Sequence, residues 1–236
     1  IQNSCNPAFI DIGQAVGAKT FLEYYKAFGL DEPTGIDLPG EGESIFHSEE
    51  QFLSNKVDLA TASFGQNFQI SPLQLITAVS AVANGGNLMK PYIVKEILDS
   101  DGNIVESTEP TVVRQVISEE TSELMCDILE TVVSEGTGKN AYVAGYHIAG
   151  KTGTSEKKAK QAETGRNDLR ISSFIAFAPA DDPQVIVLIA YDHPQESETN
   201  PKVSTTGVYI SGGNMAAIMA GELLEDILGH LGVEKT

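Results

Sequence analysis

The tetrapeptide Lys151-Thr152-Gly153-Thr154 combines the residue types that bind a small anion. The lysine ammonium supplies a positive charge with three donors, and the two threonines supply hydroxyl groups. The glycine between them has no side chain, so another backbone can approach closely. The apolar run 146–150 comes directly before it and predicts a short strand. We therefore expect an anion clamp at the end of a strand, although Lys-Thr-Gly alone also recurs by chance.

A second polar pattern, Ser4-Cys5-Asn6, lies near the other end of the chain and has the form Ser-x-Asn. Serine and asparagine are short polar side chains that can project from a rigid turn into a cleft. They also suit the N-cap of a helix, because Pro7 follows and favours a first helical turn. Together with a downstream Lys-Thr-Gly, Ser-x-Asn makes two thirds of the signature of serine enzymes that recognise penicillin.

Four further motifs follow one another along the chain in the same order as in one protein family. They are Ala-Thr-Ala-Ser-Phe-Gly-Gln at 60–66, Ile-Ser-Pro-Leu-Gln at 70–74, Ala-Asn-Gly-Gly at 83–86 and an apolar strand pair at 172–183. With the two polar patterns, they resemble the transpeptidase domain of class B penicillin-binding proteins over nearly the whole chain. One departure is Asn67, where the family usually has a second glycine. Asparagine tolerates positive φ, so we expect residues 65–67 to form the same turn with asparagine as with glycine.

The resemblance implies a D,D-transpeptidase that works by serine acyl transfer. A serine attacks the carbonyl between two D-alanines of a peptidoglycan stem peptide, the terminal D-alanine leaves, and an amine of a second stem takes the acyl group. A β-lactam acylates the same serine. The implied partners are peptidoglycan stem peptides, β-lactam antibiotics and the cell-wall synthesis machinery. The implied location is the extracytoplasmic face of the bacterial cytoplasmic membrane, and no cofactor is implied.

The resemblance also assigns roles to the residues of the two polar patterns. The clamp would bind the terminal carboxylate of the substrate, and the backbone N–H of Thr154 would be one of two oxyanion donors. Ser4 would pass a proton to the departing amine, and Asn6 would hold the amide of the acyl group. The implied catalytic groups are Ser4, Lys151 and the Thr154 N–H, and the implied substrate-binding residues are Asn6, Thr152, Gly153 and Thr154.

The nucleophile of the family lies in a Ser-x-x-Lys motif upstream of Ser-x-Asn, and only three residues precede Ser4. The one Ser-x-x-Lys here is Ser155-Glu156-Lys157-Lys158, in a polar stretch without a desolvated lysine to act as base. We interpret it as a chance match. We therefore expect the sequence to be the C-terminal part of a larger transpeptidase, inactive alone and membrane-bound only through an upstream anchor.

Two other functions stay open. The first is a non-catalytic module that binds wall peptide or β-lactam and signals. The second is a serine β-lactamase, which hydrolyses its acyl-enzyme. The Gly65-Gln66 turn and the Ser-Pro-Leu-Gln helix start at 71–74 argue against the β-lactamase.

Composition excludes several other classes of protein. The net charge of −18 over 236 residues argues against a nucleic-acid surface, which needs basic patches. Two cysteines do not make a disulfide framework, and four histidines lack metal-ligand spacing, so we expect no metal. We expect Cys126 to be a core thiol. No apolar run approaches the roughly 20 residues that span a bilayer.

Hydrophobic periodicity and turn residues predict the elements that must position these motifs. Expected helices are 11–28, 71–83, 118–135 and 214–231, and expected strands are 92–98, 104–105, 146–150, 171–178 and 184–192. The stretch 155–170 is expected to be a polar loop. Strands in hairpin order with packed helices predict an α/β fold with an antiparallel sheet. The resemblance makes this fold β-lactamase/D,D-peptidase-like, with a mostly helical lobe over 1–90, a sheet-containing lobe over 91–236, and one functional domain.

Overall fold

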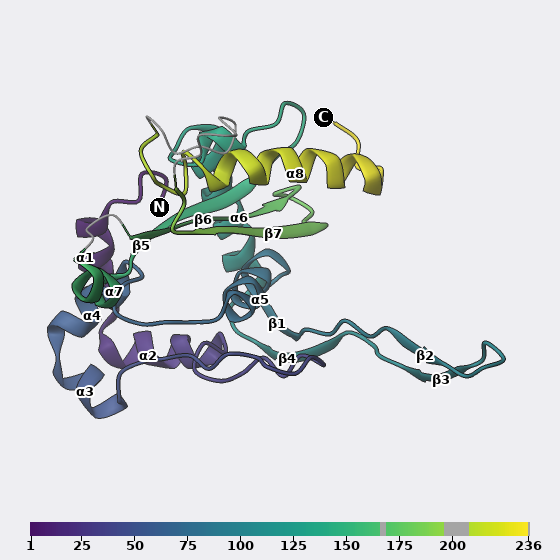
Figure 1. Ribbon diagram of the computed structural model, residues 1–236, viewed down its shortest axis with the longest axis horizontal. Helices are drawn as coiled ribbons and strands as arrows, with labels where there is room; N and C mark the ends of the chain where they lie inside the picture. Colours follow the sequence, from purple (N-terminus) through teal and green to yellow (C-terminus); the bar gives the residue numbers. More distant parts are fainter. Residues whose placement is uncertain (166–168, 196–207, 236) are drawn as a thin grey trace. The chain divides into compact units, whose positions relative to one another are not determined.

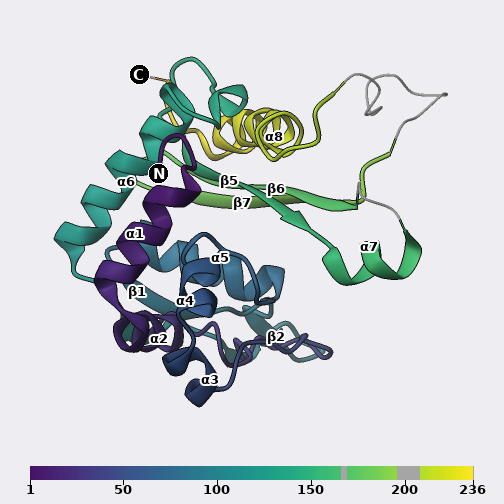
Figure 2. The ribbon, with the colours of Figure 1, turned by 90° about the vertical axis from the view of Figure 1, so that its left-hand side faces the viewer.

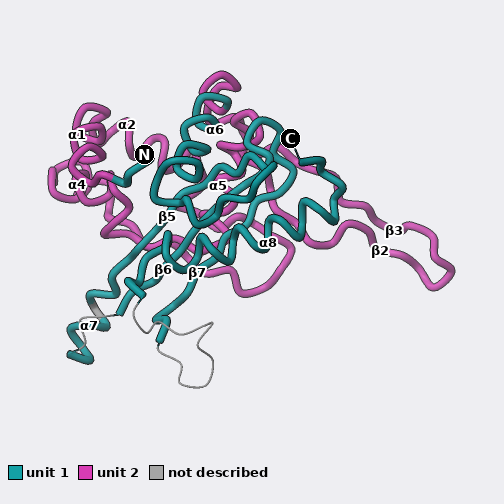
Figure 3. The backbone as a smooth tube through the Cα atoms, turned by 90° about the horizontal axis from the view of Figure 1, so that it is seen from above, with its two compact units in different colours: residues 1–4, 123–236 teal, residues 5–122 magenta. Residues whose placement is uncertain are grey.

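A computed structural model describes residues 1–165, 169–195 and 208–235. The chain forms two compact units, and each is described by itself (Figure 3). Unit 1 consists of residues 1–4 and 123–236, and unit 2 is the continuous segment 5–122. The two compact units are divided after Ser122, and Ser4 belongs to the unit that contains the clamp. The division into a helical lobe over 1–90 and a sheet-containing lobe over 91–236 stays a prediction.

Unit 1 is built on a three-stranded antiparallel sheet (Figure 1). Its strands are β5 (Ala149–Glu156), β6 (Arg170–Ala178) and β7 (Val185–Asp192), in that spatial order, so β5 lies at an edge. The α/β fold class with an antiparallel sheet is confirmed, and so are the two later strands. The strand expected at 146–150 is wrong in extent, because β5 starts at Ala149 and runs through all four clamp residues. Threonine favours extended backbone, and both clamp threonines pair with β6.

Helix α8 (Ala216–Leu231) covers one face of this sheet (Figure 2). Its buried residues recur every four positions, at Ala216, Ala220, Leu224 and Leu228. Small residues in its first turns let the helix approach the sheet closely, and the core they form includes Phe174 of β6. The helix expected at 214–231 is confirmed, starting two residues later.

Other elements of unit 1 lie around the sheet. Helix α6 (Glu119–Ser134) begins in unit 2, ends in unit 1, and is followed by a short loop and the 3₁₀ turn η1 (Lys139–Ala141). Cys126 on α6 is buried, as expected, and burial raises the pKa of its thiol. The polar loop expected at 155–170 is wrong over much of its length, because α7 (Lys158–Thr164) forms there. Residues 166–168 of that stretch lie outside the described residues.

Unit 2 holds the remaining helices. They are α1 (Asn6–Val16), α2 (Ala18–Ala27), α3 (Glu49–Ser54), α4 (Lys56–Ser63) and α5 (Pro72–Ala83). The single helix expected at 11–28 is wrong, because Gly17 adopts a φ of 83° and separates two helices. The capping box at the start of α5 is confirmed, with Ser71 and Gln74 bonding each other's backbone N–H groups. Asn67 keeps its turn at a φ of 71°.

Two small antiparallel sheets complete unit 2. One pairs β1 (Asn87–Lys90) with β4 (Thr111–Gln115), and the other is a hairpin of β2 (Glu96–Leu98) and β3 (Ile104–Ser107), drawn in Figure 1. The strand expected at 92–98 is confirmed over 96–98, where β2 pairs with β3, but it is wrong in extent, because β2 starts at Glu96. Every residue of β2 and β3 is exposed, including Ile104 and Val105.

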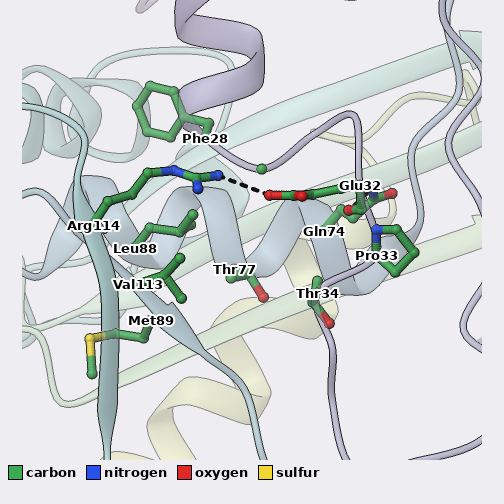
Figure 4. A pocket seen from close by; sticks show the side chains of 11 residues that line it. Phe28, Glu32, Pro33, Thr34, Gln74, Thr77, Leu88, Met89, Val113 and Arg114 are labelled. Carbon is green, nitrogen blue, oxygen red and sulfur yellow. Dashed lines mark hydrogen bonds and ion pairs between the residues drawn. The ribbon is translucent and has the colours of Figure 1, made fainter.

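Unit 2 also has a small pocket beside β1 and β4 (Figure 4). Arg114 crosses it and pairs with Glu32 at 3.2 Å, while its Nε donates to the carbonyl of Ala27 at 2.7 Å. Gln74 is buried there and donates to the carbonyls of Leu30 and Glu32. Arg114 and Gln74 are thus bonded to the protein itself, whereas the buried hydroxyl of Thr34, which also lines the pocket, has no hydrogen-bond partner among the described residues. None of the residues expected in the active site lines this pocket.

Candidate active site

The side chain of Lys151 leaves edge strand β5 and contacts Ser4, which precedes it by 147 residues. Its Nζ donates to Ser4 Oγ at 2.5 Å and to the carbonyl of Thr152 at 2.9 Å. Both residues belong to unit 1. The ammonium and the serine hydroxyl are therefore adjacent, in a position where a proton can pass between them.

The environment of Lys151 favours loss of its proton. Burial lowers the pKa of the Lys151 ammonium below its ordinary value of 10.5, because desolvation disfavours the charged form. Among the described residues, no carboxylate offsets this effect of burial. An amine with a lowered pKa gives up a proton more readily than a solvated lysine does, which suits it to proton transfer.

Ser4 is held in an unusual backbone conformation. Its φ is 48°, in the left-handed region that non-glycine residues seldom adopt, and this costs on the order of 1 kcal/mol. A turn in which Ser4 N–H donates to Ile1 O at 3.1 Å supports it. The loop after α6 supports it as well, because Thr137 N–H donates to Gln2 O at 3.2 Å. Strain of this kind is sustained only where surrounding contacts fix the backbone.

Two threonine hydroxyls extend the contact between Ser4 and Lys151. Thr152 Oγ1 lies 3.4 Å from Ser4 Oγ and 3.1 Å from Thr137 Oγ1. Thr137 was not expected in the site from the sequence. The only local signal is that it stands between Gly136 and Gly138, just after a helix, where a side chain can be turned toward a neighbour.

Gly153 and Thr154 are packed against the segment before α8. A Cβ on Gly153 would lie 2.5 Å from Ser173 Oγ, so the strand needs a glycine or a shift of that side chain here. Thr154 Oγ1 accepts from Gly212 N–H at 3.3 Å. Because the Thr154 hydroxyl accepts in this bond, its own proton can be donated to an anion.

Neither Asn6 nor the chance Ser-x-x-Lys match takes part in the hydrogen bonds described above. Asn6 belongs to unit 2, where it is exposed and is the first residue of α1. Ser155 lies in β5 while Lys158 begins α7 and is exposed, so the chance Ser-x-x-Lys has no desolvated lysine. Within the described ranges, no group of three or more His, Cys, Asp or Glu side chains could hold a metal ion.

Comparison with known proteins identifies the class to which this fold and site belong. Residues 1–209 match the family model of the penicillin-binding protein transpeptidase domain. The chain belongs to this family.

Among curated relatives, the chain is 43% identical over 235 residues to stage V sporulation protein D of Bacillus subtilis, covering 99% of this chain and 34% of that protein. It is 32% identical to a probable peptidoglycan D,D-transpeptidase FtsI of Caulobacter vibrioides, covering 99% of this chain and 38% of that protein. The chain thus spans little more than a third of the length of these relatives.

Solved structures show the same fold. Penicillin-binding protein 3 of Mycobacterium tuberculosis in complex with aztreonam matches with a TM-score of 0.84 and 27% identity, over 99% of this chain and 51% of that chain. The transpeptidase domain of penicillin-binding protein 3 from Burkholderia pseudomallei matches with a TM-score of 0.80 and 27% identity, over 98% of this chain and 63% of that chain. A search of the described helices finds none long and apolar enough to cross a membrane.

Proposed function

We propose that the chain forms part of a D,D-transpeptidase that cross-links peptidoglycan stem peptides by serine acyl transfer. The observation that carries this proposal is a hydrogen bond in a member of the transpeptidase family. Lys151, on edge strand β5, donates this bond from its Nζ to Ser4 Oγ. The names of several relatives support it, because they are peptidoglycan D,D-transpeptidases. The neighbour solved with aztreonam supports β-lactams as ligands.

In this proposal the clamp binds the C-terminal carboxylate of the stem peptide. Lys151 supplies the positive charge, Thr152 and Thr154 supply hydroxyls, and Gly153 lets the peptide backbone come close. The position of β5 at an edge of the described sheet allows the peptide to add alongside the strand. The N–H of Thr154 serves as one oxyanion donor, and removal of one such donor costs on the order of 3 kcal/mol of transition-state stabilisation.

Ser4 and Lys151 form the proton relay to the leaving group. As the amine of the terminal D-alanine departs, it takes the proton of the Ser4 hydroxyl, and Ser4 Oγ takes a proton from the Lys151 ammonium. The net change is one proton moved from Lys151 to the amine. Asn6 is assigned to the amide on the acyl side. The attacking serine is a separate residue, in a Ser-x-x-Lys motif, because Ser4 is engaged in the relay.

The proposed setting follows from the same family membership. The partners are peptidoglycan stem peptides, β-lactams and other proteins of cell-wall synthesis, at the outer face of the cytoplasmic membrane. Because the net charge of the chain is −18, the positive charge of the clamp is opposite in sign to that of the chain as a whole.

The first test is covalent labelling of the full-length gene product by a β-lactam, read by intact mass. We expect one stable adduct per chain and, with stem pentapeptide, release of D-alanine together with a cross-linked product. Lys151→Ala should slow acylation by about 100-fold or more, the range for loss of a general acid–base group. Lys157→Ala is the matched control, because its ammonium pairs with Asp192 at 2.6 Å and not with Ser4.

Other outcomes would reject the proposal in different ways. Rapid release of hydrolysed β-lactam would indicate a β-lactamase. Saturable binding without a change in mass would indicate a non-catalytic binding module. Equal slowing in the Lys151 and Lys157 variants would show that the Lys151–Ser4 contact has no special part in acylation.

A further inference from the structure

The loop between α6 and η1 holds the N-terminal segment that carries Ser4. A Cβ on Gly136 would lie 2.5 Å from Gln2 O, so the glycine allows the two backbones to meet. Thr137 N–H donates to that same carbonyl at 3.2 Å, and Gln2 Nε2 donates to Glu135 Oε2 at 3.1 Å. Three consecutive residues of the loop thus contact Gln2, two positions before Ser4.

The Thr137 hydroxyl adds a second connection, on the other side of Ser4. It lies 3.1 Å from Thr152 Oγ1, which lies 3.4 Å from Ser4 Oγ. It also donates to Gln2 O at 3.4 Å. Four hydrogen-bond links therefore run from Lys151 through Ser4, Thr152 and Thr137 to the carbonyl of Gln2.

The two ends of this chain of links fix its direction. An ammonium only donates, a carbonyl only accepts, and each hydroxyl has one proton. All four links can form together only if every hydroxyl proton points away from Lys151 and toward Gln2 O. In that arrangement Ser4 Oγ accepts from Lys151, which is the orientation needed to receive its proton. The hydrogen bond from Ser4 to Thr152 is long and therefore weak. Little free energy is lost when the Ser4 proton leaves this bond and moves to a departing amine.

We infer that Thr137 is a positioning residue. Through Thr152, it orients the Ser4 hydroxyl so that its oxygen accepts the hydrogen bond from Lys151. The inference rests on the proposed acyl-transfer function and assigns a role to a residue outside both polar motifs. Among the described residues, the Thr137 hydroxyl bonds to Thr152 and Gln2 and reaches Ser4 through them, so the inference places it on the relay. If the Thr137 hydroxyl is removed, the Thr152 hydroxyl loses the acceptor that directs its proton away from Ser4. The Ser4 hydroxyl can then rotate away from this orientation.

The variants Thr137→Val and Thr137→Ser separate the hydroxyl from the backbone contact. Valine keeps the shape of threonine and the N–H that donates to Gln2 O, but it removes the hydroxyl. Serine restores the hydroxyl. Thr131→Val is the matched control in the same unit, because the Thr131 hydroxyl donates to the carbonyl of Ile128 within its own helix. Thr137 is exposed, so none of these changes should unfold the protein.

The experiment measures β-lactam acylation of the full-length gene product over a range of antibiotic concentrations. For Thr137→Val we expect the rate constant at saturation to fall about 3- to 10-fold, the effect of one or two modest hydrogen bonds. The half-saturating concentration should stay the same, because the inference gives Thr137 a role in the relay and none in holding the ligand. Thr137→Ser should recover most of the rate, and Thr131→Val should match the wild type.

Three results would overturn the inference. The first is an unchanged saturated rate in Thr137→Val, and the second is a Thr137→Ser variant as slow as the valine variant. The third is a rise in the half-saturating concentration of Thr137→Val with no change in its saturated rate constant. In each case wild-type acylation would still support the proposed function. If the wild type is not acylated at all, the proposed function fails first and the inference fails with it.

Discussion

At the scale of single residues, the site depends on the half-buried ammonium of Lys151. Lys151 lies in a chain of strongly negative net charge, yet its ammonium is bonded to the hydroxyls of Ser4 and Thr152 and to the carbonyl of Thr152, and to no carboxylate among the described residues. A carboxylate partner would have stabilised the charged form. The site instead keeps the ammonium partly desolvated, which leaves its charge and its proton available to a substrate.

This environment predicts the pH dependence of acylation. The relay needs protonated Lys151, and burial lowers its pKa below 10.5, so acylation should fall as pH rises through that lowered value. Arginine stays charged well above this range. In Lys151→Arg we therefore expect a slower reaction whose alkaline decline is shifted to higher pH or absent, measured as the acylation rate of the full-length gene product against pH. An alkaline limb at the same pH in both proteins would assign it to another group.

Sequence reasoning reached part of this site. The catalytic roles that the resemblance implied for Ser4 and Lys151 require the two side chains to lie close together, and they are in contact. Thr137 could not be found in the same way, because its connection depends on where the loop after α6 meets Gln2. Nor does the sequence indicate the left-handed backbone of Ser4, a conformation that its tertiary contacts impose.

At the scale of elements, edge strand β5 is held by backbone packed closely against it. A Cβ on Gly212 would lie 2.1 Å from Ser173 O and 2.7 Å from Gly153 O. Both neighbours are main-chain atoms, which cannot move aside as a flexible side chain can. The segment before α8 therefore fixes the position of the clamp strand as well as covering it.

Gly212→Ala should accordingly destabilise the protein by about 1–3 kcal/mol, the typical cost of overpacking. Gly229→Ala is the control, because a Cβ there would meet nothing within 4 Å and Gly229 lies inside α8. Alanine should stabilise that helix by about 0.5–1 kcal/mol. Urea denaturation of the purified variants measures both. Equal stability of the two variants would contradict the close packing described for Gly212.

Local signals predicted some elements well and others poorly. The α5 capping box and the strand pair β6–β7 follow from short patterns that need no tertiary information. The break at Gly17 was missed because apolar residues continue across it, from α1 into α2. Helix α7 was missed because its lysine-rich sequence has no apolar stripe and resembles a solvated loop.

At the scale of the whole molecule, one unit is continuous in sequence and the other is not. Unit 2 is the single segment 5–122 and has its own core of Leu22, Phe52, Leu59 and Ala62. Unit 1 needs residues 1–4 as well as the segment from 123 onward. A sequence pattern does not show this division, because the two parts of unit 1 meet only through tertiary contacts.

The continuity of unit 2 predicts that it can fold by itself. We expect the segment 5–122, expressed alone, to show a cooperative thermal transition by circular dichroism and dispersed amide resonances. The segment 123–236 expressed alone lacks Gln2 and Ser4, so it should be the less stable of the two and should regain stability when residues 1–4 are joined to it by a flexible linker. A non-cooperative transition for 5–122 would show that its core is insufficient.

The discontinuity of unit 1 also sets the order in which the site can assemble during translation. Ser4 is synthesised 147 residues before Lys151, and the whole of unit 2 is made in between. At typical rates of synthesis, this separation is roughly 7 to 30 seconds. The serine must therefore remain without its lysine while an entire neighbouring unit leaves the ribosome, and the relay can form only near the end of the chain's production.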